Sequence, residues 1–244
     1  MKFELKYKQF TDCSILVEWP QKIDKSILYD ILAFKAKLEA DDASTIESLT
    51  HAYASILITY HRRTFFNFSL EEKRLKETYQ SLEIKNVPQR RLWKIPVCYD
   101  KDFGIDLEFL SKEKNMSVDA IIDKHSGAIY TVYFIGFLPG FLYLGGLDKL
   151  LSTPRRATPR LKIEEGAVAI GGSQTGIYPV ESPGGWHVIG NSPIRFFDVS
   201  KAVPCFAKAG DGIQFYPITL ENYKNIKTLV NTNAYQIESE VLDD

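Results

Sequence analysis

Three arginines stand close together between prolines, and they are well suited to bind an anion. The segment reads PRRATPR, so Arg155 and Arg160 each follow a proline and Arg156 lies between them. A guanidinium group is planar and can hold a carboxylate or a phosphate through two parallel hydrogen bonds. A backbone fixed by proline lowers the cost of ordering such a side chain on binding. The alternative is an ion pair inside the fold, with a nearby carboxylate such as Glu164, Glu165 or Asp198.

Other side chains in the same region could form the rest of a site. Gln174 and Tyr178 can orient a polar ligand, although a turn hydrogen bond and a packed ring would explain them equally well. His125, near the end of a predicted helix, is the candidate acid or base because the pKa of histidine ordinarily lies near neutrality. A helix cap is the alternative for it. Four residues suit the wall of a site that takes a flat group: Phe137, Pro139, Phe141 and Trp186.

Nearly all of these residues lie in one stretch, from Gly136 to Pro193. It holds eleven of the fifteen glycines and six of the eleven prolines. Glycine serves where the backbone needs a positive φ or a close approach to another group, and proline where φ must be fixed. The stretch therefore predicts shaped loops between short strands. A plain set of surface turns on a small β-barrel remains the alternative.

The distribution of glycine predicts two domains, residues 1–88 and 89–244. Residues 1–87 contain no glycine, and glycine is frequent from Gly104 onward, so the linker is placed at residues 86–89. The first part shows the order strand, strand, helix, strand, strand, helix, with helices capped by Asp24 and Ser69. This order predicts a small α/β sandwich with both helices on one face of the sheet.

The second part predicts a closed or nearly closed β-barrel, which makes the whole chain an α+β protein. A helix should run from Ser117 to His125 and end at Gly127. Residues 130–135 are apolar on both faces and read as a central strand that leads into the glycine-rich stretch. A helix at 223–230 should be followed by a frayed end. Further short strands are predicted at 167–170, 186–189, 194–197 and 212–216.

Four ordered blocks within the glycine-rich stretch resemble the signature of a known family. They are GFLPGF at 136–141, the two PR pairs at 154–160, QTGIYP at 174–179 and SPGGW at 182–186. The pattern is similar to that of the 5-oxoprolinase B-subunit family, also called the kinase A inhibitor (KipI) or allophanate hydrolase subunit 1 family. Many members carry Arg-Thr-Pro where this chain has Asn191-Ser192-Pro193, so no role of that arginine is carried over.

The resemblance implies a cyclophilin-like barrel and one component of an ATP-dependent 5-oxoprolinase, which opens the small molecule 5-oxo-L-proline to L-glutamate. It implies two partners, a homologous carboxyltransferase-type C subunit and a LamB/YcsF-type A subunit, and a chain that is inactive alone. ATP is implied for the complex only, because Gly172 stands where a phosphate-binding loop requires lysine. Two other functions stay open: an inhibitor of a sporulation-type histidine kinase, and a carboxyltransferase-like subunit of a urea amidolyase or allophanate hydrolase system.

Composition argues against several other classes. The net charge is −1 without a long run of one sign, which disfavours nucleic-acid and membrane-surface partners. No apolar run suits a signal peptide or a membrane span. The three cysteines are far apart and odd in number, which favours reduced thiols in a cytoplasm. No metal is expected, since His51 and His61 have no further ligands at a suitable spacing.

Overall fold

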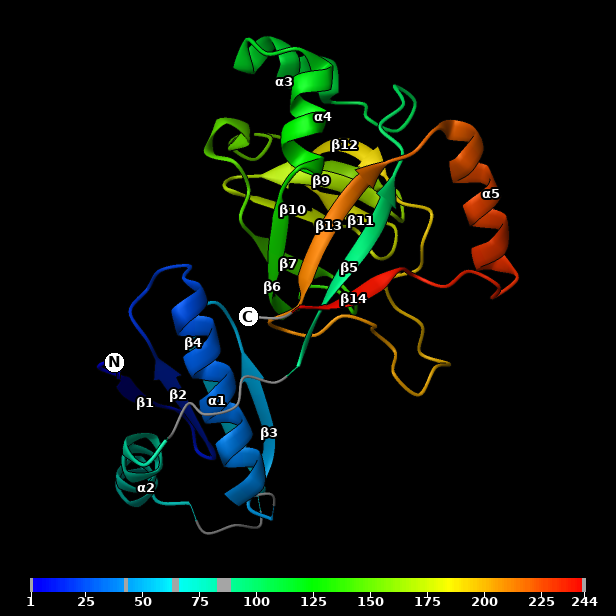
Figure 1. The fold of residues 1–244 in the computed structure, drawn as a ribbon. Helices are drawn as coiled ribbons and strands as arrows, with labels where there is room; N and C mark the ends of the chain where they lie inside the picture. Colours follow the sequence, from blue (N-terminus) through cyan, green and yellow to red (C-terminus); the bar gives the residue numbers. More distant parts are fainter. Residues whose placement is uncertain (1, 42–43, 63–65, 83–88, 243–244) are drawn as a thin grey trace. The chain divides into compact units, whose positions relative to one another are not determined.

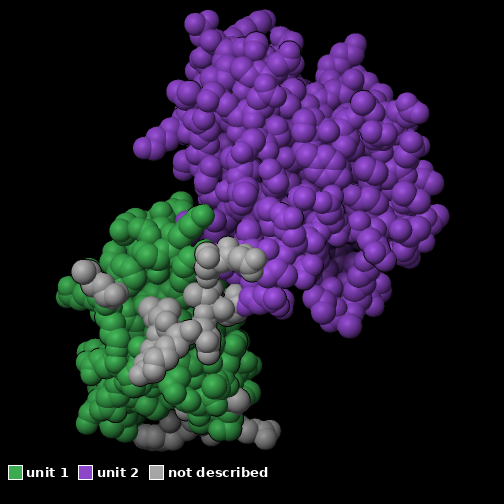
Figure 2. Space-filling view, viewed as in Figure 1, with its two compact units in different colours: residues 1–88 green, residues 89–244 purple. Residues whose placement is uncertain are grey.

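The computed structural model describes residues 2–41, 44–62, 66–82 and 89–242. The chain divides into two compact units, Met1–Pro88 and Gln89–Asp244, shown in green and purple in Figure 2. Of the linker predicted at residues 86–89, only Gln89 lies within the described part of the chain.

The first unit is a four-stranded antiparallel sheet with two helices (Figure 1). Ile15 and Val17 of one central strand pair with Ile58 and Ile56 of the other, and all four side chains are fully buried. They share one core with apolar residues of both helices, so the predicted order of elements is confirmed. In chain order the elements are β1 (Lys6–Thr11), β2 (Ser14–Glu18), α1 (Lys25–Asp41), β3 (Ile46–His51), β4 (Ser55–Tyr60) and α2 (Phe68–Gln80).

The two helix starts compare differently with the sequence. The carboxylate of Asp24 accepts a hydrogen bond from the backbone of Ser26 at 2.9 Å, as expected for the residue before α1. The predicted cap of α2 at Ser69 is wrong. Asn67 caps that helix instead, and its side-chain oxygen accepts from the backbone N–H of Leu70 at 3.2 Å. Asparagine is as good a cap as serine, and Ser69 already lies in the first turn.

The second unit is built on an eight-stranded sheet with the order β12-β9-β10-β7-β6-β13-β5-β14. The residue after β5, Cys98, exchanges two backbone hydrogen bonds with Asn191 at the end of β12, 2.8 and 2.9 Å long. This bridge joins the β5 and β12 ends of the sheet and closes it into the predicted barrel. The strands are β5 (Arg90–Val97), β6 (Ile129–Ile135), β7 (Leu142–Gly145), β8 (Arg160–Ile163), β9 (Ala167–Gly171), β10 (Gln174–Ile177), β11 (Ser182–Gly184), β12 (His187–Asn191), β13 (Gly212–Pro217) and β14 (Ser239–Leu242).

Helices cover parts of the barrel, and a two-stranded ribbon of β8 and β11 stands beside it. Two of the helices lie together at one end of the barrel, and the side chain of Ser117 caps the second of them as predicted (Figure 1). The helices are α3 (Leu107–Lys114), α4 (Val118–Ser126), the short 3-10 helix η1 (Lys149–Leu151) and α5 (Leu220–Asn231).

Two predictions for the second unit are wrong. Residues 194–197 form no strand: Ile194 and Phe196 are buried in the core, and this alternation of inward residues imitates a strand pattern without a pairing partner. The end of the chain does not fray throughout, because β14 pairs with the edge strand β5 through residues 239–242. A short segment gains order when a sheet edge offers it backbone partners.

Candidate functional site

A pocket of about 260 Å³ in the second unit collects five of the residues predicted for the site. We call it the aromatic pocket. Its walls come from the loop before β7, the loop before β8, the end of β10 and the turn between β11 and β12. Its lining residues are Phe137, Phe141, Tyr143, Arg155, Pro159, Tyr178, Pro183, Gly184, Gly185 and Trp186.

Phe141 is the centre of the aromatic wall. Its ring lies edge-to-face with that of Tyr178 at 5.6 Å and with that of Trp186 at 5.8 Å between centroids. Edge-to-face pairs are a favoured arrangement of aromatic rings. All three side chains are at most 5% exposed, so this wall is held in place by the core beneath it.

Two glycines of the sequence motifs allow this close packing. A Cβ atom at Gly171 would lie 2.5 Å from the ring of Trp186, and a Cβ atom at Gly184 would lie 2.3 Å from the hydroxyl of Tyr178. Any side chain at either position would push an aromatic ring out of the wall. The glycine-rich motifs therefore shape the pocket directly, in addition to turning the chain.

Phe137 stands at the exposed side of the same pocket. It is 64% exposed, and its φ of +64° lies in the left-handed region that a bulky side chain rarely adopts. Its ring meets Phe141 edge-to-face at 5.6 Å. The left-handed backbone costs roughly 1–2 kcal/mol, and such cost is typical of residues held for a function.

Arg155 brings the positive charge to this pocket. Its guanidinium lies 5.8 Å from the centroid of the Trp186 ring, in a cation–π arrangement. Among the residues that the structure describes, no carboxylate pairs with it. Burial raises the pKa of Tyr178 to about 12, although hydrogen bonding from the Trp186 backbone and the nearby Arg155 act in the opposite direction. The Tyr178 hydroxyl is therefore neutral near pH 7 and able to donate a hydrogen bond.

Arg160 does not line the aromatic pocket, because its guanidinium is held by a buried carboxylate. Its two terminal nitrogens each donate to a different oxygen of Asp106, both at 2.7 Å, and Asp106 is only 3% exposed. The structure thus realises the ion-pair alternative with a different partner from Glu164, Glu165 and Asp198. Asp106 stands 54 residues away from Arg160 in the sequence, and nothing local marks it as a partner.

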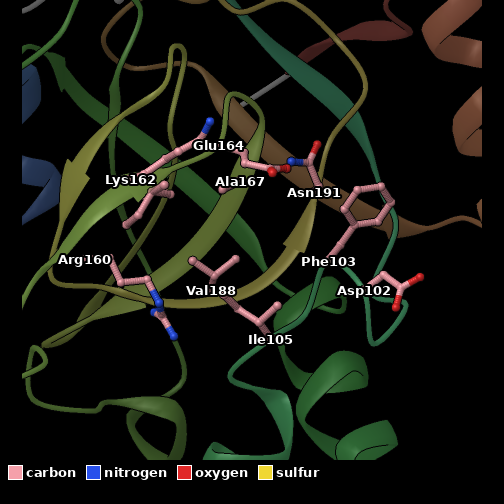
Figure 3. Close-up of a pocket in the computed structure, with 10 residues that line it drawn as sticks. Asp102, Phe103, Ile105, Arg160, Lys162, Glu164, Ala167, Val188 and Asn191 are labelled. Carbon is pink, nitrogen blue, oxygen red and sulfur yellow. The ribbon is translucent and has the colours of Figure 1, made fainter.

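A second cavity, of about 230 Å³, lies on the Arg160 side of the ribbon. Figure 3 shows Arg160 and Lys162 on one side of it, Phe103 and Asn191 on the other, and an apolar floor between them. Its main polar groups already have partners. Lys162 pairs with Glu181 at 2.7 Å, and the Asn191 side chain accepts from the hydroxyl of Tyr223 at 2.9 Å. The aromatic pocket, whose cation has no carboxylate partner in the described part of the chain, is the better candidate site.

His125 lies in the barrel core and lines neither cavity. It is fully buried, with the Tyr99 hydroxyl 2.8 Å from Nδ1, the Thr175 hydroxyl 2.8 Å from Nε2, and its ring stacked on Phe215. Burial lowers the pKa of His125 to about 3. A histidine with both nitrogens occupied and no open face has no path to a substrate, so we assign it to the core rather than to the site.

The remaining predicted residues lie apart from the two cavities. Gln174 opens β10 and is half-buried, and Pro139 is exposed in the loop before β7. In the described ranges no three His, Cys, Asp or Glu side chains gather as a metal site would require. No helix among the described residues combines the length and the apolar character needed to cross a membrane.

The fold of the chain is that of a carboxyltransferase-type protein. The structure aligns with the crystal structure of K. lactis urea amidolyase at a TM-score of 0.82 and 21% identity, over 98% of this chain and 16% of that one. Residues 5–207 match the family described as carboxyltransferase domain, subdomain C and D, and the chain belongs to that family.

Two curated relatives within this likeness carry the same name, that of the B subunit of 5-oxoprolinase. The relative from Bacillus subtilis (strain 168) is 31% identical over 240 residues, which are 93% of this chain and 98% of the relative. The relative from Haemophilus influenzae is 45% identical over 151 residues, which are 62% of this chain and 70% of the relative.

Proposed function

We propose that this chain is the B subunit of an ATP-dependent 5-oxoprolinase, the enzyme that opens 5-oxo-L-proline to L-glutamate. The aromatic pocket, with Arg155 as its cation, is the observation that carries the proposal. The two relatives named above support it, since one of them aligns over nearly its whole length.

5-Oxo-L-proline suits the aromatic pocket in size, shape and charge. It is a nearly flat five-membered lactam with one carboxylate. The ring would lie against the faces of Trp186 and Phe137, and the guanidinium of Arg155 would pair with the carboxylate. The Tyr178 hydroxyl would donate to the lactam oxygen. The cavity of about 260 Å³ is at the small end of ligand pockets, which span about 300–1,000 Å³.

In the reaction, the residues of this chain bind and orient the lactam. Phe137 covers the exposed side of the pocket and limits the access of water. ATP supplies the driving force when it converts the lactam oxygen into a phosphate leaving group, after which water adds to the carbon and the C–N bond breaks. The sequence offers no phosphate-binding loop for the nucleotide. Nucleotide binding therefore falls to the partners, a carboxyltransferase-type C subunit and a LamB/YcsF-type A subunit, in the cytoplasm.

The test is 5-oxoproline-dependent ATP hydrolysis by the three subunits mixed, with this chain present and with it omitted. We expect turnover only with all three proteins and none with this chain alone. L-Proline, which lacks the lactam oxygen, is the matched control ligand. Turnover that persists when this chain is omitted would refute the proposed function, and robust lactam hydrolysis by the single chain would refute its dependence on partners.

A further inference from the structure

Asp106 lies where three segments of the second unit meet. One carboxylate oxygen accepts from Arg160 at 2.7 Å and from Arg156 at 3.4 Å. The other accepts from Arg160 at 2.7 Å and from the backbone N–H of Val188 at 2.7 Å. A single buried carboxylate thus ties the loop before β8, the start of α3 and strand β12 together.

The position of Asp106 within its own helix indicates that this role is not incidental. Asp106 occupies the N-cap of α3, where an aspartate ordinarily accepts a hydrogen bond from the first turn. Here its side chain makes no capping bond. The stabilisation of about 1 kcal/mol that a cap provides is forgone. The side chain is used for contacts with residues 50 to 82 positions away in the sequence.

The loop held by Asp106 is the one that carries Arg155. At its start, Thr153 exchanges two backbone hydrogen bonds with Gly172. The backbone of Arg156 donates to the carbonyl of Gly185 at 2.8 Å. Between these anchors, Arg155 is exposed and reaches over Trp186, while its neighbour Arg156 reaches toward Asp106. The direction of Arg155 therefore depends on where the loop is held.

Charge gives the same result. Arg155, Arg156 and Arg160 place three positive charges within six residues. Asp106 engages the second and third of them and leaves the first without a carboxylate partner among the described residues. An uncompensated buried charge is strongly unfavourable. Without the Asp106 carboxylate, Arg156 and Arg160 would have to move toward water and would take the loop with them.

We infer that Asp106 is a positioning residue, which acts through Arg156 and Arg160 to keep Arg155 over the aromatic pocket. Asp106 does not line that pocket. The functional consequence rests on the proposed binding of 5-oxo-L-proline, whereas the placement of Arg155 over Trp186 is testable without any ligand.

The test compares Asp106→Asn, which keeps the size but removes the charge, with Glu181→Gln. Glu181 pairs with Lys162 on the same ribbon, but both side chains are more than half exposed. In each variant the indole N–H resonance of Trp186 is followed by NMR, and it is assigned by its loss in Trp186→Phe. We expect the Trp186 signal to move in Asp106→Asn as it does in Arg155→Ala, and to stay in Glu181→Gln. An unmoved signal in folded Asp106→Asn overturns the inference.

The second measurement is the affinity of the purified chain for 5-oxo-L-proline, taken by calorimetry on folded protein. We expect Asp106→Asn to bind about tenfold more weakly, and Glu181→Gln to bind as the unaltered chain does. If Asp106→Asn does not fold, Arg156→Gln removes the longer 3.4 Å contact alone and should move the Trp186 signal in the same direction. If the unaltered chain fails to bind 5-oxo-L-proline while the Trp186 signal still moves, the proposed function falls and the positioning role of Asp106 stands.

Discussion

The guanidinium of Arg160 and the carboxylate of Asp106 form two parallel hydrogen bonds of 2.7 Å each. Arg155, five residues earlier, has no such partner among the described residues and lies over the ring of Trp186. Two arginines with the same local sequence, each directly after a proline, therefore have different surroundings. The first predictions separate their roles.

Arg160→Lys should destabilise the chain. Lysine keeps the charge but cannot form both hydrogen bonds with Asp106, since it has one ammonium group in place of a planar fork. The loss of one hydrogen bond to a buried charged group costs about 1–3 kcal/mol. The midpoint of thermal unfolding should fall accordingly, measured by circular dichroism. An unchanged midpoint would mean that the Asp106–Arg160 pair contributes little to stability.

Arg155→Lys should leave the stability unchanged and weaken ligand binding. The side chain is exposed, and substitutions at such positions usually change the free energy of unfolding by less than about 0.5 kcal/mol. The loss of one charge-assisted hydrogen bond to a bound carboxylate costs about 2 kcal/mol, or roughly thirtyfold in affinity. Calorimetry with 5-oxo-L-proline gives the affinity. Unaltered affinity would remove Arg155 from the proposed site.

His125 should make the stability depend on pH. Burial lowers the pKa of His125 from 6.5 to about 3, so the folded chain keeps the imidazole neutral where the unfolded chain binds a proton. The stabilisation is complete above pH 6.5 and is lost as the pH falls toward 3, by up to about 1.4 kcal/mol per pH unit. Urea unfolding between pH 4 and 8 measures it. His125→Gln should lack this part of the slope, and equal slopes in both proteins would contradict the prediction.

The two units should separate on limited proteolysis. The only lysine between Leu82 and Gln89 is Lys85, whereas Arg90 and Arg91 lie in β5, where the backbone N–H of Arg91 donates to Asp211 at 3.0 Å. Trypsin should cut after Lys85 and release a stable fragment that begins at Asn86, identified by mass spectrometry. Early cleavage within residues 92–217, with Lys85 intact, would argue against two independently folded domains.

Much of the fold is determined by local sequence. The alternation of Ile15 and Val17 in one strand and of Ile56 and Ile58 in another is enough to predict half-buried strands. The glycine and proline motifs between residues 136 and 193 predict the loops that carry the aromatic wall, because backbone geometry at these residues depends on near neighbours. Phe141, Tyr178 and Trp186 could therefore be assigned to one region from the sequence alone.

The tertiary structure decided what long-range contacts control. The sequence leaves Arg155 and Arg160 equivalent, and only the approach of Asp106 across 54 residues gives one of them a structural partner and leaves the other exposed. In the same way, the end of α4 could equally have been at the surface, and the closed barrel places His125 against Tyr99, Thr175 and Phe215. Burial and pairing depend on which segments meet in space, and a local pattern of residues does not contain that information.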